Sequence, residues 1–165
     1  MAPKINIVAI YQEILANIQT CTPEFFEEKI AKLPEPKKTK KNWLKANNFE
    51  LLGKAISHQN NLLAVYLFNE LQHQALSFLR FDNYHHLSMA FCQTDQLIFN
   101  YLFQHLPALE RESFFTIRGL FLYKFALENN AIEHVDKLFE IDAKGVGSYI
   151  RYRTFESLLK VIKSS

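Results

Sequence analysis

The sequence predicts an all-α protein made of stacked helix-hairpin repeats. Only 4 Gly and 5 Pro occur in 165 residues, which is too few for the many tight turns of an all-β fold. Apolar residues recur at helical spacing along most of the chain, and one set of them repeats about every 35 positions. The length and the 48% hydrophobic content are typical of a single domain with its own core.

Two amphipathic helices are expected before residue 34. The first is predicted from Lys4 to Thr20, because its apolar residues fall on one face of a helix. Thr22 and Pro23 indicate the start of the second, with Thr22 as the N-cap and Pro23 at the first helical position. Pro34 is expected to end it. We interpret residues 1–33 as an N-terminal helical cap that covers the apolar end of the repeats.

Residues 34–48 are predicted to form a lysine-rich linker. Pro34 and Pro36 precede the run Lys37-Lys38-Thr39-Lys40-Lys41. Such a run can bind phosphate or act as a targeting patch, but it is also typical of a solvated connection between helices, and we prefer that interpretation. The formal net charge of +2 gives no overall nucleic-acid footprint, so nucleic acid is not the expected partner.

Residues 49–165 are predicted to hold three helical repeats and a closing helix. Each copy has an apolar helix, a short polar break and a second apolar helix; the first helices are Leu51–Ile56, His86–Phe91 and Leu122–Leu127. In each copy an alanine precedes a Leu-Phe pair by 12 positions. The alanines are Ala55, Ala90 and Ala126, and the pairs begin at Leu67, Leu102 and Leu138, with separations of 35 and 36 in both sets. Ser148 to Lys163 has the pattern of an amphipathic closing helix.

The repeat resembles a degenerate ankyrin repeat. Leu52-Gly53-Lys54-Ala55-Ile56 and Val65-Tyr66-Leu67-Phe68, separated by a polar turn, are similar to that family's Leu-x-x-Ala-Ala and Val-Val-x-Leu-Leu helices. The resemblance covers roughly Phe49 to Ile141 and implies an ankyrin-like α-solenoid. The family's Thr-Pro-Leu-His tetrapeptide and β-turn stretch are absent, and the connections Gln72–Asn83 and Pro107–Gly119 are long. Another kind of α-solenoid therefore stays open.

The sequence offers no recognisable catalytic, metal or cofactor motif, so we expect neither an enzyme nor a cofactor. The six histidines lack the H-x-x-x-H spacing of metal sites, and the two cysteines form no CxxC pair. Cys92 lies about two helical turns from His85 and His86, which is too far for a Cys–His pair on one helix. Gly145 and Gly147 lack the Lys-Ser/Thr of a phosphate loop.

Binding of a partner protein is the preferred function. Residues that precede the first helix of each repeat should converge on one edge of the stack, and Arg and Tyr are common hot-spot residues at interfaces. The candidates are Arg80, Asp82, Asn83, Tyr84 and His85 before the second copy, Arg118 before the third, and Tyr149, Arg151 and Tyr152 in the closing segment. The last three could also form a basic face with aromatic anchors, or stack on bases.

Two other functions stay open. The chain could be a regulatory or inhibitory subunit that masks an enzyme, or a hydrolase or transferase whose site is assembled from distant residues. No run of about 20 apolar residues and no signal peptide is visible, so we expect a cytoplasmic protein. The ankyrin resemblance also implies a possible bacterial effector delivered into a host cytosol, because divergent repeats rich in Lys, Asn, Phe and Ile are common in that class.

Overall fold

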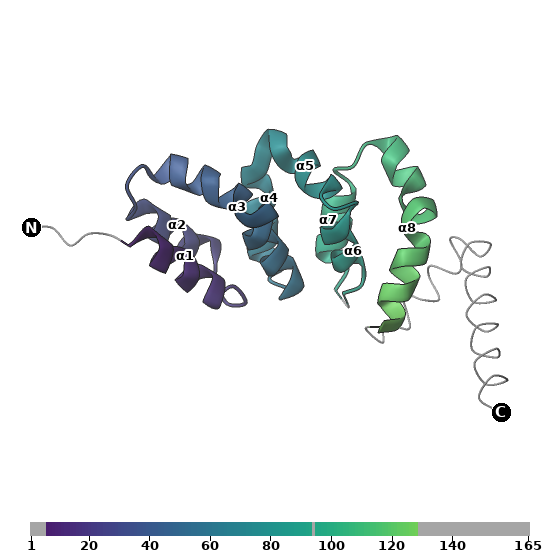
Figure 1. Cartoon of the computed structure of the whole chain (residues 1–165), viewed down its shortest axis with the longest axis horizontal. Coiled ribbons are helices and arrows are strands. Elements are labelled where there is room, and N and C mark those ends of the chain that lie inside the picture. The colour runs from purple at the N-terminus through teal and green to yellow at the C-terminus, as the bar shows by residue number, and fades with distance from the viewer. Residues whose placement is uncertain (1–5, 94, 129–165) are drawn as a thin grey trace, which may run out of the picture. The chain divides into compact units, whose positions relative to one another are not determined.

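The computed structural model describes residues 6–93 and 95–128, and every regular element in this part is a helix. The chain divides into two compact units. Within the described residues the first unit holds 6–90 and 95–105, and the second holds 91–93 and 106–128. The elements are α1 (Ile7–Ala16), α2 (Pro23–Ala31), α3 (Pro36–Ser57), α4 (Asn61–Leu71), the 3₁₀ helix η1 (Gln72–Gln74), α5 (Ala75–Arg80), α6 (His85–Phe91), α7 (Leu97–Phe103) and α8 (Ala108–Glu128) (Figure 1).

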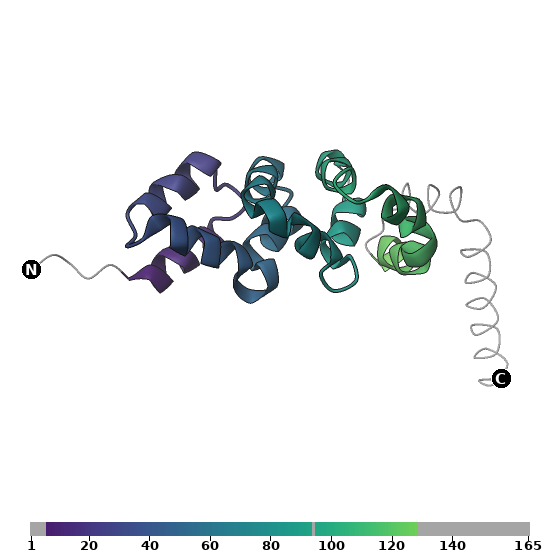
Figure 2. The same ribbon diagram turned by 90° about the horizontal axis from the view of Figure 1, so that it is seen from above.

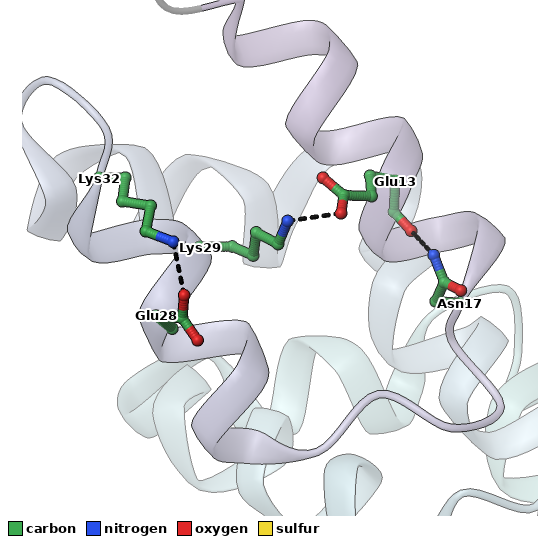
Figure 3. A network of polar contacts seen from close by, with 5 residues as sticks. All are labelled: Glu13, Asn17, Glu28, Lys29 and Lys32. Carbon is green, nitrogen blue, oxygen red and sulfur yellow. Dashed lines mark hydrogen bonds and ion pairs between the residues drawn. The ribbon is translucent and has the colours of Figure 1, made fainter.

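Helix α2 begins as its sequence predicts, whereas α1 begins at Ile7 with Asn6 as its N-cap and ends at Ala16, before the predicted Thr20. Thr22 is the N-cap of α2, where its hydroxyl accepts a hydrogen bond from the Phe25 amide at 3.2 Å, and Pro23 occupies the first helical position. An ion pair joins the two helices at the surface, because the Lys29 ammonium lies 2.5 Å from the Glu13 carboxylate (Figure 3). Local contacts therefore fix the start of α2 and join α1 to α2.

The predicted lysine-rich linker is wrong in its secondary structure. Residues 36–45 form the first part of α3, which Pro36 begins because a proline without an amide proton fits the first turn of a helix. Trp43 and Leu44 on this part are buried, and their burial outweighs the repulsion of the lysine run. The backbone leaves helical geometry at Ala46–Phe49, and the second part of α3, residues 50–57, then continues to Ser57.

Helix α4 is at the centre of the first unit. It packs against α2, α3, α5 and α7, and the two views show it beside α3 and α7 (Figures 1 and 2). Asn60 begins the helix by accepting a hydrogen bond from the Leu63 amide at 3.1 Å. The same side chain donates to the carbonyls of Ile18 and Cys21, both at 2.8 Å. One asparagine therefore caps α4 and ties it to the chain that follows α1.

Burial within the first unit repeats every 35 residues. Buried residues occupy equivalent positions on α3 and on α5–α6, and again on α4 and α7. The exposed positions repeat too, since Leu62 is 65% exposed at the start of α4 and Leu97 is 68% exposed at the start of α7. The buried pairs are Trp43 and Phe78, Leu44 and Leu79, Leu51 and His86, Leu52 and Leu87, Ala55 and Ala90, Leu63 and Ile98, and Leu67 and Leu102.

Polar residues that join the helices repeat with the same spacing. The Tyr66 hydroxyl on α4 donates to Glu27 on α2, and the Tyr101 hydroxyl on α7 donates to Asn69 on α4 at 2.6 Å. Asp95, which lies 35 positions after Asn60, accepts the Leu97 amide at 2.9 Å and the Asn61 side chain at 2.6 Å. The tyrosines and the capping residues of the two second helices are thus 35 positions apart, whereas the residues that they bond are not at that spacing.

Both long connections between the predicted helix pairs are mainly helical, contrary to the expectation of linkers. Residues 72–80 form η1 and α5, with Phe78 and Leu79 buried. Residues 108–119 are the first part of the continuous helix α8, in the second unit.

In the second unit Phe114, Leu122 and Ala126 are buried, and the Phe91 and Phe115 rings meet edge to face at 5.6 Å. Ala55, Ala90 and Ala126 are therefore all buried, as predicted; Leu138 and the closing helix lie outside the described residues.

Candidate binding pocket between two left-handed turns

Two short turns of left-handed backbone stand 35 residues apart in the first unit. The first is Asn47–Phe49, with φ between 48° and 64°, and the second is Asp82–Tyr84, with φ between 42° and 65°. Asn and Asp tolerate this conformation better than other residues with side chains, but Phe49 and Tyr84 are strained, at a cost on the order of 1 kcal/mol each. Such strain persists only where the surrounding packing enforces it, and it is concentrated at binding and active sites.

The two turns border one shallow, open depression of about 460 Å³, which we name the two-turn pocket. Its walls come from the turns themselves and from the helices that follow them, the second part of α3 and α6. The lining residues are Asn47, Asn48, Glu50, Gly53, Lys54, Ser57, Phe81, Asp82, His85, His86 and Met89. Most of the lining residues are of polar types, and they include two carboxylates, one ammonium and two imidazoles.

His86 is the most unusual group in the two-turn pocket. Its side chain is 7% exposed, and the ring stacks on Phe78 at 4.8 Å and on Phe81 at 5.4 Å. Within the described residues neither ring nitrogen has a hydrogen-bond partner of good geometry. A buried polar group without a partner costs about 1–3 kcal/mol, so its presence calls for an explanation.

Burial also decides the charge of His86. Desolvation and the neighbouring His85 lower its pKa to about 4, while the backbone of Asn48 and the carboxylate of Asp82 offset part of the lowering. The imidazole is therefore neutral at pH 7, with one nitrogen able to donate and the other able to accept.

Glu50 fixes the first turn to α1. Its carboxylate accepts hydrogen bonds from the Asn47 side-chain amide at 2.7 Å and from the Tyr11 hydroxyl at 3.1 Å. The Tyr11 ring meets Trp43 edge to face at 5.1 Å, and its pKa is raised by burial and by the nearby Glu50 charge. Glu50 therefore holds Asn47 in position at the pocket, beside a phenol that stays neutral at pH 7.

Only some of the binding residues that the sequence predicts line the two-turn pocket. Asp82 and His85 line the two-turn pocket, while exposed Arg80 and half-buried Tyr84 belong to the same segment but are not part of the lining. Arg118 is half-buried on α8, in the second unit. Tyr149, Arg151 and Tyr152 lie outside the described residues.

Sequence reasoning missed His86, Asn47 and Glu50. The 35-residue register contains the signal for His86, since it places this histidine at the position of the fully buried Leu51. The signal for the turns is the pair Asn47-Asn48 and its counterpart Asp82-Asn83, because these residue types favour left-handed backbone.

Neither cysteine has the environment of a catalytic thiol. Burial raises the pKa of Cys92 to about 12 and raises that of Cys21 as well, whereas nucleophilic thiols have lowered values. Among residues 6–93 and 95–128 no three His, Cys, Asp or Glu side chains gather closely enough to hold a metal ion. Within the same residues no helix is long and apolar enough to cross a membrane.

Comparison with protein-family models, with curated proteins and with solved structures gives no match.

Proposed function

We propose that this chain is a helical-repeat module that binds a partner protein, and that the two-turn pocket is its binding site. The 35-residue periodicity of burial, of left-handed turns and of the tyrosines that form inter-helix hydrogen bonds supports a stack of related units. In such a stack, equivalent segments of successive units lie side by side and build one surface. The ankyrin-like arrangement belongs to this proposal, with helical connections in place of that family's β-turn stretch.

The observation that carries the proposal is the unpartnered imidazole of His86. In the preceding copy the equivalent residue is Leu51, which fills its place in the core without any polar cost. A leucine at position 86 would avoid burying two nitrogens without hydrogen bonds. Retention of a histidine there is explained when a partner opens the pocket on binding, exposes the two ring nitrogens that are covered in the free chain, and completes their hydrogen bonds.

The lining of the pocket indicates which groups a partner would bring. A neutral imidazole accepts one hydrogen bond and donates one, and Glu50 and Asp82 accept more. A side chain rich in N–H donors, such as an arginine or an asparagine, satisfies this set best. Met89 and Phe81 add apolar surface that such a side chain would cover.

Photocrosslinking tests this function. A benzophenone amino acid replaces Asp82 in one protein and exposed Gln19 in a control, and each is irradiated in cell lysates. We expect one dominant adduct at position 82 that excess unlabelled wild-type protein abolishes. Excess His86→Leu protein should compete at least tenfold more weakly, although it is as stable as the wild type or more so. Equal competition by the two proteins would show that the pocket is not the binding site.

A further inference from the structure

A second concave surface lies on the first unit, formed by the first part of α3, the end of α4 and η1. It is a cavity of about 330 Å³, which we name the lysine groove. Lysines form one wall, glutamines and a histidine form the other, and two leucines lie between them. The lining residues are Lys37, Lys40, Lys41, Leu44, Lys45, Glu70, Leu71, Gln72, His73 and Gln74.

Three of these lysines form a stripe. Lys37, Lys41 and Lys45 stand four residues apart on one helix, which places them on the same face, and all three are exposed. Within the described part of the chain none of the three forms an ion pair. Like charges at this spacing destabilise a helix by roughly 0.2–0.5 kcal/mol per pair, so a bound anion would relieve repulsion that the chain itself leaves uncompensated.

Lys40 has a different role in the same wall. Its ammonium lies 2.6 Å from Glu70 and 2.9 Å from Glu27, and it donates to the Tyr66 hydroxyl at 3.2 Å. Desolvation lowers the pKa of Lys40, but the hydrogen bonds that its ammonium donates to these partners raise the pKa above the ordinary value. The network joins α2, α3 and α4, so the groove is held in shape without a ligand, and the Glu70 charge is already compensated by Lys40.

The spacing of the stripe indicates the ligand. Four residues of α-helix rise about 6 Å, so successive ammonium groups of the stripe start about 6 Å apart. Alternate residues of an extended peptide are separated by about 6.7 Å and point the same way. We propose that the lysine groove binds an extended acidic segment of a protein, with carboxylates at every second position facing Lys37, Lys41 and Lys45.

Other anions match the groove less well. A single phosphate reaches one or two of the lysines, whereas the stripe presents three along a line. A nucleic-acid strand needs aromatic platforms for its bases, and the groove is lined by Leu44 and Leu71 instead. The wall opposite the lysines carries the side-chain amides of Gln72 and Gln74, which suit the polar backbone of a peptide, and its Glu70 carboxylate is paired with Lys40. This inference concerns a surface distinct from the two-turn pocket and does not depend on it.

Fluorescence anisotropy with defined peptides tests the proposal on the full chain. The probe is a labelled peptide with alternating glutamate and serine, and its comparison is a peptide of the same composition with all glutamates adjacent. Inorganic phosphate and an oligothymidylate serve as competitors. The groove variant is Lys41→Gln/Lys45→Gln, and the matched control is Lys32→Gln/Lys38→Gln, which removes the same charge from exposed lysines outside the groove.

We expect the alternating peptide to bind best, with an affinity that falls as salt increases. The groove variant should lose about tenfold or more in affinity and most of the salt dependence, while the control pair changes it less than about twofold. His86→Leu should leave this binding unchanged, which separates it from the two-turn pocket. Equal losses in both lysine variants, equal binding of the two peptides, or preferred binding of phosphate or oligothymidylate would overturn the proposal. Circular dichroism of each variant verifies that the fold is retained.

Discussion

The imidazole of His86 lies directly over the α-carbon of Gly53, so that a methyl group added at Gly53 would meet the ring carbon Cε1 at 2.7 Å. This contact joins the second part of α3 to α6 at the two-turn pocket. The ring cannot easily withdraw, because Phe78 and Phe81 stack on it.

Gly53→Ala is therefore expected to destabilise the protein. An alanine in the middle of a helix normally stabilises it by about 1 kcal/mol relative to glycine. Here the clash should outweigh that gain and leave a net loss of about 1 kcal/mol or more in the free energy of unfolding, measured by urea denaturation. In a His86→Ala background, which removes the ring, Gly53→Ala should stabilise instead. A stabilising effect in the wild-type background would contradict the contact.

The stability of the wild type should fall between pH 6.5 and pH 4. Because the folded protein holds the pKa of His86 at about 4, below the ordinary value of 6.5, the unfolded chain binds a proton first as the pH falls. The contribution of neutral His86 to the free energy of unfolding is complete above pH 6.5. It is lost progressively as the pH falls toward 4, and the total loss is at most about 3 kcal/mol. His86→Leu should remove this component of the pH dependence. The difference between the two unfolding curves isolates it from the carboxylates, and parallel curves would show that His86 titrates normally.

Ala90→Leu should overpack the core between equivalent helices. Ala55 and Ala90 have no exposed surface, which fits close packing at both positions of the 35-residue register. Extra methylenes should cost about 1–3 kcal/mol and lower the melting temperature. Ala9→Leu, at an exposed position of α1, is the matched control and should change the stability by less than about 0.5 kcal/mol. Equal melting temperatures for the two variants would argue against the register.

Asn60→Ala should cost more than the loss of a helix cap alone. The substitution removes the cap of α4 and both hydrogen bonds to the carbonyls of Ile18 and Cys21. We expect a loss of about 2–4 kcal/mol by chemical denaturation. Asn60→Asp keeps an acceptor for the cap but loses both hydrogen bonds that Asn60 donates. We expect its stability to lie between that of the wild type and that of the alanine variant. An aspartate variant as stable as the wild type would show that the two hydrogen bonds to the segment after α1 contribute nothing to stability.

Much of the helical architecture could be predicted from local pattern. The cap at Thr22, the break between Ser57 and Asn61 and the burial of Ala55 and Ala90 follow from residue types and from the register. The helical structure of the first part of α3 could not be predicted. Its lysine run indicates a solvated linker, and only the folded chain shows that Trp43 and Leu44 are buried. Propensity is a weak guide where tertiary burial decides.

The candidate site was predicted only in part. Asp82 and His85 were identified as edge residues, and both line the two-turn pocket. Asn47 and Glu50 line the same pocket and stand 35 positions before Asp82 and His85, and only the folded chain shows that these segments meet. His86 was hidden because its adjacency to His85 suggests a helix end, whereas its equivalence to Leu51 indicates the core.

The central claim, that binding occurs in the two-turn pocket, is tested most directly by nuclear magnetic resonance. Amide and imidazole chemical shifts of the labelled protein are followed while the protein captured at position 82 is added. We predict that the largest changes fall on Gly53, Asp82 and His86, and that His86→Leu needs at least tenfold more partner to show them. Changes that leave these three residues unaffected and appear elsewhere on the first unit would contradict the account.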